Sequence, residues 1–107
     1  MAALAHLQRA GLRLVVRNYR TPGRGGSEVD LILRDRDGTL VFVEVRQRSH
    51  AAWGGAAASV GWTKQRRVTR AARHFLLGLP TPPPCRFDVV AIDGGQLQWL
   101  RAAFDAA

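Results

Sequence analysis

The sequence predicts one α/β domain, residues 1–107, in which helices flank a central mixed β-sheet. Short runs rich in Val, Ile, Leu and Phe are separated by turns that contain Gly and Asp, a pattern typical of β-strands. One longer segment, residues 60–79, instead repeats its apolar residues at helical spacing. Because this helix falls between strands, it predicts a crossover connection, and the sheet should hold parallel as well as antiparallel pairs.

The first part of the chain predicts a helix, a strand and a loop. Residues 2–10 place apolar side chains at helical spacing, and Gly11 is suited to end that helix. Residues 12–19 alternate between an apolar face and a partly basic face, which indicates a strand. Residues 18–27 are rich in Gly and are expected to form a loop.

Residues 28–48 predict a β-hairpin, and its turn decides where the acidic side chains lie. A two-residue turn at Asp37-Gly38 would send Asp30 and Glu44 to opposite faces of the sheet. A three-residue loop with Gly38 in the left-handed conformation is also common, and it places Asp30 directly opposite Glu44. We choose this second register because it gathers the charged side chains of both strands on one face.

The chosen register also places Glu28 opposite Arg46, so that three acids and one cation form a cluster. Carboxylates within an apolar strand are costly to bury unless a cation or a metal ion compensates them. The other face of the hairpin is then apolar and should pack in the core. It consists of Val29, Leu31, Leu33, Val41, Val43 and Val45.

The second half of the chain predicts a long helix and two strands. Prolines between residues 80 and 84 end the helix of residues 60–79. Residues 86–92 predict a buried strand, residues 96–100 a short strand, and residues 101–107 a frayed helical turn. The stripe of the long helix that should face the sheet consists of Val60, Val68, Ala71, Ala72, Phe75, Leu76 and Leu79.

The composition favours an anionic partner. The chain carries 16 Lys and Arg residues against 8 Asp and Glu, a formal net charge of +8. A strongly basic domain suggests nucleic acid, DNA or RNA, and a solvated arginine-rich surface is the alternative. The single Cys argues against a disulfide framework, and no apolar run is long enough for a bilayer, so we expect a cytoplasmic protein without a membrane partner.

Basic residues around the acidic strands are the candidates for holding a phosphate backbone. Trp53 and Trp62, in and after the Gly- and Ala-rich segment 47–61, could stack on bases, although a place in a core or an interface is the more common role. The candidate nucleic-acid-binding residues are Arg20, Arg24, Arg48, Lys64, Arg66 and Arg67.

The acidic cluster is a candidate metal site. Two converging carboxylates, Asp30 and Glu44, offer hard oxygen ligands that suit Mg²⁺ or Mn²⁺, and Glu28 is a candidate third ligand. Such an ion can polarise a phosphodiester and lower the pKa of a bound water, while Arg46 stabilises charge on the phosphate. Asp30, Glu44 and Arg46 are therefore the candidate catalytic residues. A structural salt bridge of Glu28 or Glu44 with Arg46 stays open as the alternative.

Five ordered segments of the chain resemble the YraN-like family of small bacterial proteins. They are residues 17–20 (Arg-Asn-Tyr-Arg), 28–32, 40–46, 64–67 and 85–92, and together they span nearly the whole chain. The resemblance implies a restriction-endonuclease-like fold and a likeness to the PD-(D/E)xK nucleases, whose metal is bound by an Asp and a Glu on a hairpin. By that likeness Asp30 and Glu44 would bind the metal, and Arg46 occupies the lysine position.

The sequence departs from that family at two places. The family usually has Lys where this chain has Arg46, and Arg stays charged and cannot act as a base. The family also carries a Gly-x-x-Gly-Glu segment on its first helix, and this sequence starts after it, either through loss of the Glu or through the start assigned at Met1. Glu28 could replace that Glu, and Lys64 could supply a mobile ammonium, although a helix-surface charge is its more ordinary role.

We therefore expect a nucleic-acid-binding protein with a metal-dependent nuclease-like site, whose activity is retained, weakened or lost. Its reaction would be the cleavage of a phosphodiester with Mg²⁺ or Mn²⁺. A non-catalytic nucleic-acid-binding module and a protein-interaction domain with a basic surface are the alternatives.

Overall fold

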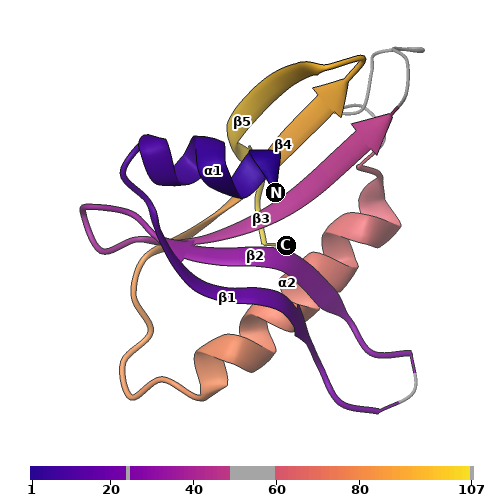
Figure 1. Ribbon diagram of the computed structural model, residues 1–107. Coiled ribbons are helices and arrows are strands. Elements are labelled where there is room, and N and C mark those ends of the chain that lie inside the picture. The colour runs from indigo at the N-terminus through magenta and orange to yellow at the C-terminus, as the bar shows by residue number, and fades with distance from the viewer. Residues whose placement is uncertain (24, 49–59, 107) are drawn as a thin grey trace.

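The computed structural model describes residues 1–23, 25–48 and 60–106 (Figure 1). Within these residues, five strands form one sheet, with α1 on one face and α2 on the other. The elements in chain order are α1 (Ala2–Arg9), β1 (Arg13–Arg20), β2 (Glu28–Arg34), β3 (Leu40–Arg48), α2 (Trp62–Leu77), β4 (Cys85–Asp93) and β5 (Gln96–Phe104). Neither of these helices is long and apolar enough to cross a membrane.

The sheet follows the order of the chain, β1-β2-β3-β4-β5. β3 and β4 pair in parallel and are joined by the crossover through α2, whereas the other neighbouring strands pair in antiparallel fashion. The sheet is therefore mixed, as predicted. This α/β architecture is consistent with the restriction-endonuclease-like fold that the resemblance implies, and the predicted fold class is confirmed.

The β2–β3 hairpin adopts the predicted register. Gly38 ends the loop in the left-handed region, at φ 90°, where a glycine carries no steric penalty. Leu31 lies opposite Val43, so the pairing is that of the three-residue loop. The same register brings Asp30 and Glu44 to one face of the sheet.

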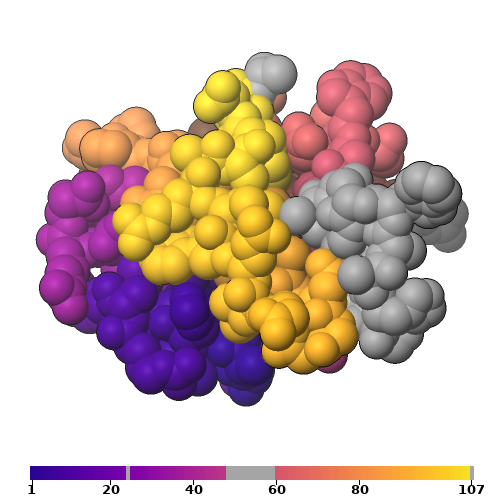
Figure 2. Space-filling view, turned by 90° about the horizontal axis from the view of Figure 1, so that it is seen from above, coloured from indigo at the N-terminus to yellow at the C-terminus, as the bar shows by residue number. Residues whose placement is uncertain are grey.

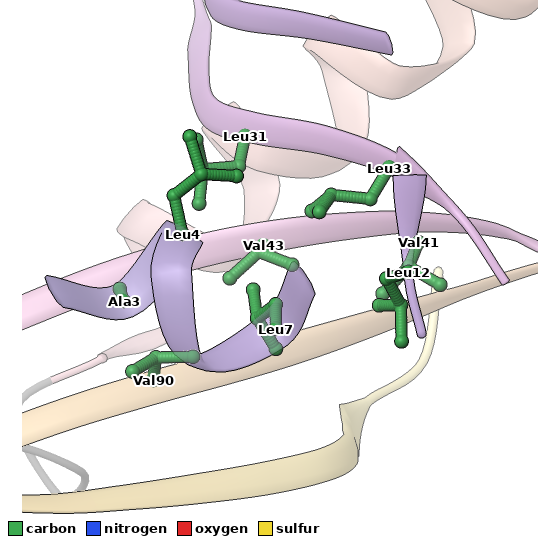
Figure 3. Packing of buried hydrophobic residues seen from close by; sticks show 9 residues of the cluster. All are labelled: Ala3, Leu4, Leu7, Leu12, Leu31, Leu33, Val41, Val43 and Val90. Carbon is green, nitrogen blue, oxygen red and sulfur yellow. The ribbon is translucent and has the colours of Figure 1, made fainter. Parts of the chain in front are cut away.

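Apolar side chains of the sheet pack into two clusters, one on each face. Since helices cover both faces, the central strands are buried on both sides, and the clusters fix where each helix lies. The cluster under α1 contains Ala3, Leu4, Leu7, Leu12, Leu31, Leu33, Val41, Val43 and Val90 (Figure 3). The cluster under α2 contains Val29, Ile32, Leu40, Phe42, Val68, Ala71, Ala72 and Phe87.

Val29 departs from the predicted pattern. Strict alternation places it with Leu31 and Leu33 on the α1 side, but it packs in the cluster under α2. The pairing of β2 with β3 extends only as far as Leu31, and the N–H of Val45 donates instead to the carboxylate of Asp30, at 2.7 Å. A side chain thus replaces a bond of the ladder, and the alternation ends at the same point.

β5 runs to Phe104, so the predicted helical turn at residues 101–107 is wrong. The strand continues because an irregularity opposite β4 absorbs two extra residues of β5 between Leu100 and Phe104, with Ala102 in the left-handed region at φ 48°. The Ala102 N–H donates to the buried carboxylate of Asp88 at 2.9 Å. An acid inside β4 therefore secures β5, which crosses the face seen from above in Figure 2 (yellow).

Asp88 is also the centre of a polar network. It accepts hydrogen bonds from Arg86 Nε at 3.1 Å and from Trp99 Nε1 at 3.0 Å. Arg86 Nη1 reaches Asp35 at 2.9 Å, at the start of the hairpin loop, and its guanidinium lowers the pKa of that carboxyl. The network joins the hairpin to β4 and β5, and it stabilises the end of the sheet away from the acid pair.

Candidate metal and nucleic-acid site

Asp30 and Glu44, here called the acid pair, lie on the α2 side of the sheet. Phe42 points into the cluster under α2, and Glu44 follows two residues later on the same strand, so it faces the same side. The first turns of α2 lie next to the C-terminal end of β3 (Figure 1). The acid pair therefore sits between the sheet and the start of the crossover helix.

Glu44 is the buried member of the acid pair. Only 2% of its side chain is exposed, and the Lys64 Nζ from α2 lies 3.2 Å from its Oε1 atom. The other oxygen, Oε2, is buried and makes no hydrogen bond within the described part of the chain. Leaving a charged oxygen buried without a partner is costly, so a second cationic or proton-donating group at Oε2 would stabilise Glu44.

The electrostatics of Glu44 show the same incomplete compensation. Burial of the carboxyl, together with the charge of Asp30, raises the pKa of Glu44 to about 7. Lys64 and Arg46 act in the opposite direction and lower this pKa. Lys64 and Arg46 do not restore the ordinary acidity of Glu44, so a further positive charge next to this carboxyl would stabilise its ionised form.

Asp30 is partly exposed and is held in place by the backbone. Its Oδ2 atom accepts the hydrogen bond of the Val45 N–H at 2.7 Å. Val45 directly follows Glu44, so this bond fixes one carboxylate of the acid pair next to the other. A carboxylate that is positioned before a ligand arrives loses little freedom when it binds one.

The acid pair fits a hard divalent cation. Mg²⁺ is commonly bound through one or two carboxylates, with water and phosphate oxygens as its remaining ligands, and Mn²⁺ prefers the same donors. The unsatisfied Glu44 Oε2 and the neighbouring Asp30 carboxylate are such donors. Asp30 and Glu44 are therefore the residues that would hold an Mg²⁺ or Mn²⁺ ion.

Glu28 does not join the acid pair. Its carboxylate lies 3.0 Å from Arg20 Nε, in a pair whose side chains are 41% and 74% exposed. Because β2 pairs with β3 only from Leu31 onward, Glu28, which precedes this point, does not occupy the position opposite Arg46 that the register predicts. Across the described ranges, no group of three or more His, Cys, Asp and Glu side chains could hold a metal ion, so the predicted cluster of three acids is not formed.

A hollow next to the acid pair is lined by cations and an aromatic side chain. Arg46 and Lys64, the two residues that lower the pKa of Glu44, both line it, and Trp62 and Arg67 contribute from the first turns of α2. The hollow therefore joins the surroundings of the acid pair to the exterior of the helix. A phosphate entering it would meet guanidinium and ammonium groups, which bind phosphate oxygens well.

The predicted nucleic-acid contacts on α2 divide into two groups. Arg66 and Arg67 are exposed on the outer side of the helix, whereas Lys64 points inward to Glu44. The surface position that the sequence favours for Lys64 is therefore not the one observed. The sequence does contain an indication of the inward position. Lys64 precedes the buried Val68 by one helical turn, so the two residues lie on the same side of α2.

The remaining predicted contacts lie elsewhere. Arg20 is engaged with Glu28 where the loop between β1 and β2 begins. Arg48 ends β3, with its backbone opposite Asp93 on β4. Arg24 and the segment 49–59, which includes Trp53, lie outside the described residues. The roles of these arginines in binding stay predictions.

Fold and site together define a small α/β domain with a mixed sheet and an acid pair between hairpin and crossover helix. The model of a known family, Uncharacterised protein family UPF0102, matches residues 1–92. The chain belongs to this family, which is the YraN-like family of the sequence resemblance.

Relatives in this family are similar over nearly the whole chain. A UPF0102 protein of Paracidovorax citrulli (strain AAC00-1) is 71% identical over 104 residues, which cover 97% of this chain and 77% of the relative. A UPF0102 protein of Acidovorax sp. (strain JS42) is 70% identical, covering 98% and 80%. The UPF0102 protein Reut_A3265 of Cupriavidus pinatubonensis is 64% identical, covering 96% and 79%. No solved structure matches the chain.

Proposed function

We propose that this protein binds nucleic acid and carries a metal-dependent phosphodiesterase site, in which Asp30 and Glu44 hold Mg²⁺ or Mn²⁺. The observation that carries the proposal is the state of Glu44. It is buried next to Asp30, one of its oxygens is unsatisfied, and its pKa is raised to about 7. A carboxylate kept so close to another acid, next to a hollow lined by cations, is suited to bind a metal ion.

The chain supplies the groups that such a reaction needs. A bound divalent ion would neutralise phosphate charge and make a coordinated water more acidic. Arg46 and Lys64 line the hollow and hold the phosphodiester by charge-assisted hydrogen bonds, which strengthen as negative charge grows on the phosphate. The resemblance places a lysine on the strand where this chain has Arg46. In this proposal Lys64, which comes from α2, supplies the ammonium group in its place.

Nucleic acid is the substrate class that the charge supports. The chain has a formal net charge of +8, and α2 contains five Lys and Arg residues and no acid. Such a surface attracts a polyanion and orients it before specific contacts form. A protein of this kind would act on cellular DNA or RNA in the cytoplasm.

A non-catalytic nucleic-acid-binding module is the second candidate, and the acid pair itself favours it. Two acids converge where three were expected, and Arg46, which cannot take up a proton, stands at the lysine position of the resemblance. In this function the metal ion and the cations would hold a phosphate without cleaving the chain.

A cleavage assay separates the two candidates. Labelled DNA and RNA, single-stranded and duplex, are incubated with the protein and Mn²⁺ or Mg²⁺. We expect cleavage that is lost in Asp30→Asn and Glu44→Gln and retained in Glu28→Gln, the matched change at the acid that lies apart from the pair. Binding without cleavage would favour the second candidate, and the absence of both would contradict the proposal.

A further inference from the structure

The outer side of α2 carries a row of arginines, and α2 itself contains no Asp or Glu. Arg66, Arg67 and Arg70 are all exposed, and Asp105, which follows β5, is the acid that lines the same side of the helix. Arg66 and Arg70 are one turn apart, so their side chains are neighbours, and like charges at this spacing destabilise a helix. A polyanion laid along the helix would remove this repulsion.

Trp62 adds a different kind of group to the same surface. It is 67% exposed, although large apolar side chains are usually buried, and the Arg66 guanidinium lies over its ring at 4.6 Å. Trp99 offers a contrast within the molecule. Arg101 also lies over its ring, but Trp99 is partly buried and its indole N–H is bound to Asp88, so that ring serves the packing of β5.

Trp62 lies where two hollows meet. One is the hollow next to the acid pair, which Trp62 lines together with Arg46 and Lys64. The other is a cavity of about 170 Å³ along the outer side of α2, lined by Trp62 and three arginines and also by one acid, Asp105. A chain that follows the second hollow and passes Trp62 therefore reaches the hollow lined by Arg46 and Lys64, and Lys64 contacts Glu44 of the acid pair. Figure 2 shows the start of α2 (pink) projecting at the surface.

We propose that the outer side of α2 binds single-stranded nucleic acid, with a base stacked on Trp62 and the backbone phosphates on Arg66 and Arg70. This proposal rests on the proposed function, and it names the form of the substrate. An unpaired base is required because a base inside a duplex has both of its faces covered by its neighbours. Aromatic platforms next to a basic groove are the usual means of binding single strands without sequence preference.

Binding in EDTA tests the surface apart from cleavage. A labelled oligo-dT 12-mer and a matched duplex are titrated, with fluorescence anisotropy as the readout. Trp62→Ala should weaken binding of the single strand about 5- to 150-fold, the range of one stacked base, and change duplex binding far less. Trp62→Phe keeps an aromatic face and should stay within about threefold, but it should lose the quenching of indole emission on binding.

Salt dependence tests the phosphate contacts. Arg66→Ala and Arg70→Ala should each reduce the slope of log affinity against log salt by about 0.7. Arg9→Ala, on the helix that covers the opposite face of the sheet, is the matched control and should leave the slope unchanged. These side chains are exposed, so the variants should fold as the parent does.

The outcomes distinguish this proposal from the proposed function. Three results would overturn the proposed binding surface. The first is unchanged affinity in Trp62→Ala, and the second is an equal loss of affinity for single strand and duplex. The third is displacement of the oligonucleotide by poly-glutamate at equal charge. The last result would assign α2 to an acidic protein partner. If one of these results is found and the protein still cleaves nucleic acid, the proposed metal site is retained and only the binding surface is refuted. If the protein binds through Trp62 but shows no Mn²⁺-dependent cleavage, only the phosphodiesterase activity is refuted.

Discussion

Lys64 on α2 lies against Glu44 on β3, with 3.2 Å between Nζ and Oε1. The ion pair joins the crossover helix to the sheet at the acid pair, and it places a cation where the chain buries a carboxylate. The Lys64 side chain is itself only 25% exposed. Breaking this pair should therefore affect both the stability of the fold and the chemistry of the site.

Lys64→Met should destabilise the protein at pH 8 by about 1–3 kcal/mol and have little effect at pH 5. Burial already raises the pKa of Glu44 from 4.5 to about 7, so the folded state holds a proton that the unfolded chain releases as the pH rises through this window. Without Lys64 this pKa rises further, and the loss of stability with pH becomes larger. Urea denaturation at both pH values measures the effect.

The double variant Lys64→Met, Glu44→Gln is the control for this prediction. It removes the buried charge together with its partner, so its stability should no longer fall between pH 5 and pH 8 for this reason. An equal loss at both pH values in Lys64→Met alone would show that Lys64 contributes by packing and not by charge.

Asp88→Ala should destabilise the protein by about 3–5 kcal/mol, because it leaves a partly buried Arg86 without a main partner and removes the acceptor of the Ala102 N–H. Asp35→Asn, at the more exposed end of the network, should cost less. The folded-state pKa of Asp35 is lowered, so its contribution is present at neutral pH and is lost as acid protonates it. Urea denaturation of both variants measures these effects. A larger loss of stability in Asp35→Asn than in Asp88→Ala would contradict the prediction.

The sequence predicted the parts of the fold that depend on local pattern. The three-residue loop at Gly38 determined the register, and the register brought Asp30 to the face of Glu44. The apolar stripe of α2 correctly identified the side of the helix that packs on the sheet. These features follow from spacing along one segment, which is why they can be read without a structure.

The sequence did not predict features that depend on contacts between distant segments. Glu28 was expected in the cluster because nothing local marks the point where β2 leaves β3. The extent of β5 depends on Asp88, a residue of another strand that holds the bulge at Ala102. The inward position of Lys64 depends on where α2 crosses the sheet, although its spacing from Val68 carries a signal.

Cleavage should respond differently to the two cations near Glu44. Lys64→Met removes a cation that touches the acid pair and should reduce the rate about 10²- to 10³-fold, as expected for a group that stabilises transition-state charge. Arg46→Lys keeps the charge and introduces the lysine that the resemblance to the nuclease family implies at this position, so its rate should equal or exceed that of the parent. Single-turnover rates with excess enzyme measure both, and a rate in Arg46→Lys as low as in Lys64→Met would contradict the division of roles.

Metal affinity should depend on pH because a proton competes for Glu44. Below the pKa of about 7 the carboxyl is protonated, and an ion must displace that proton, so affinity should fall about tenfold per pH unit. Above pH 7 to 8 the affinity should level off. Titrations of Mn²⁺ between pH 5.5 and 8.5 measure the profile, and an affinity that is constant across this range would exclude Glu44 as a ligand.

The central claim is that Asp30 and Glu44 together bind a divalent ion, and calorimetric titration of Mn²⁺ at pH 8 tests it most directly. The protein should bind one Mn²⁺ per chain, Glu28→Gln should bind it equally well, and Asp30→Asn and Glu44→Gln should each lose at least tenfold in affinity. Absence of binding to the parent protein, or equal affinity in Glu44→Gln, would contradict the claim.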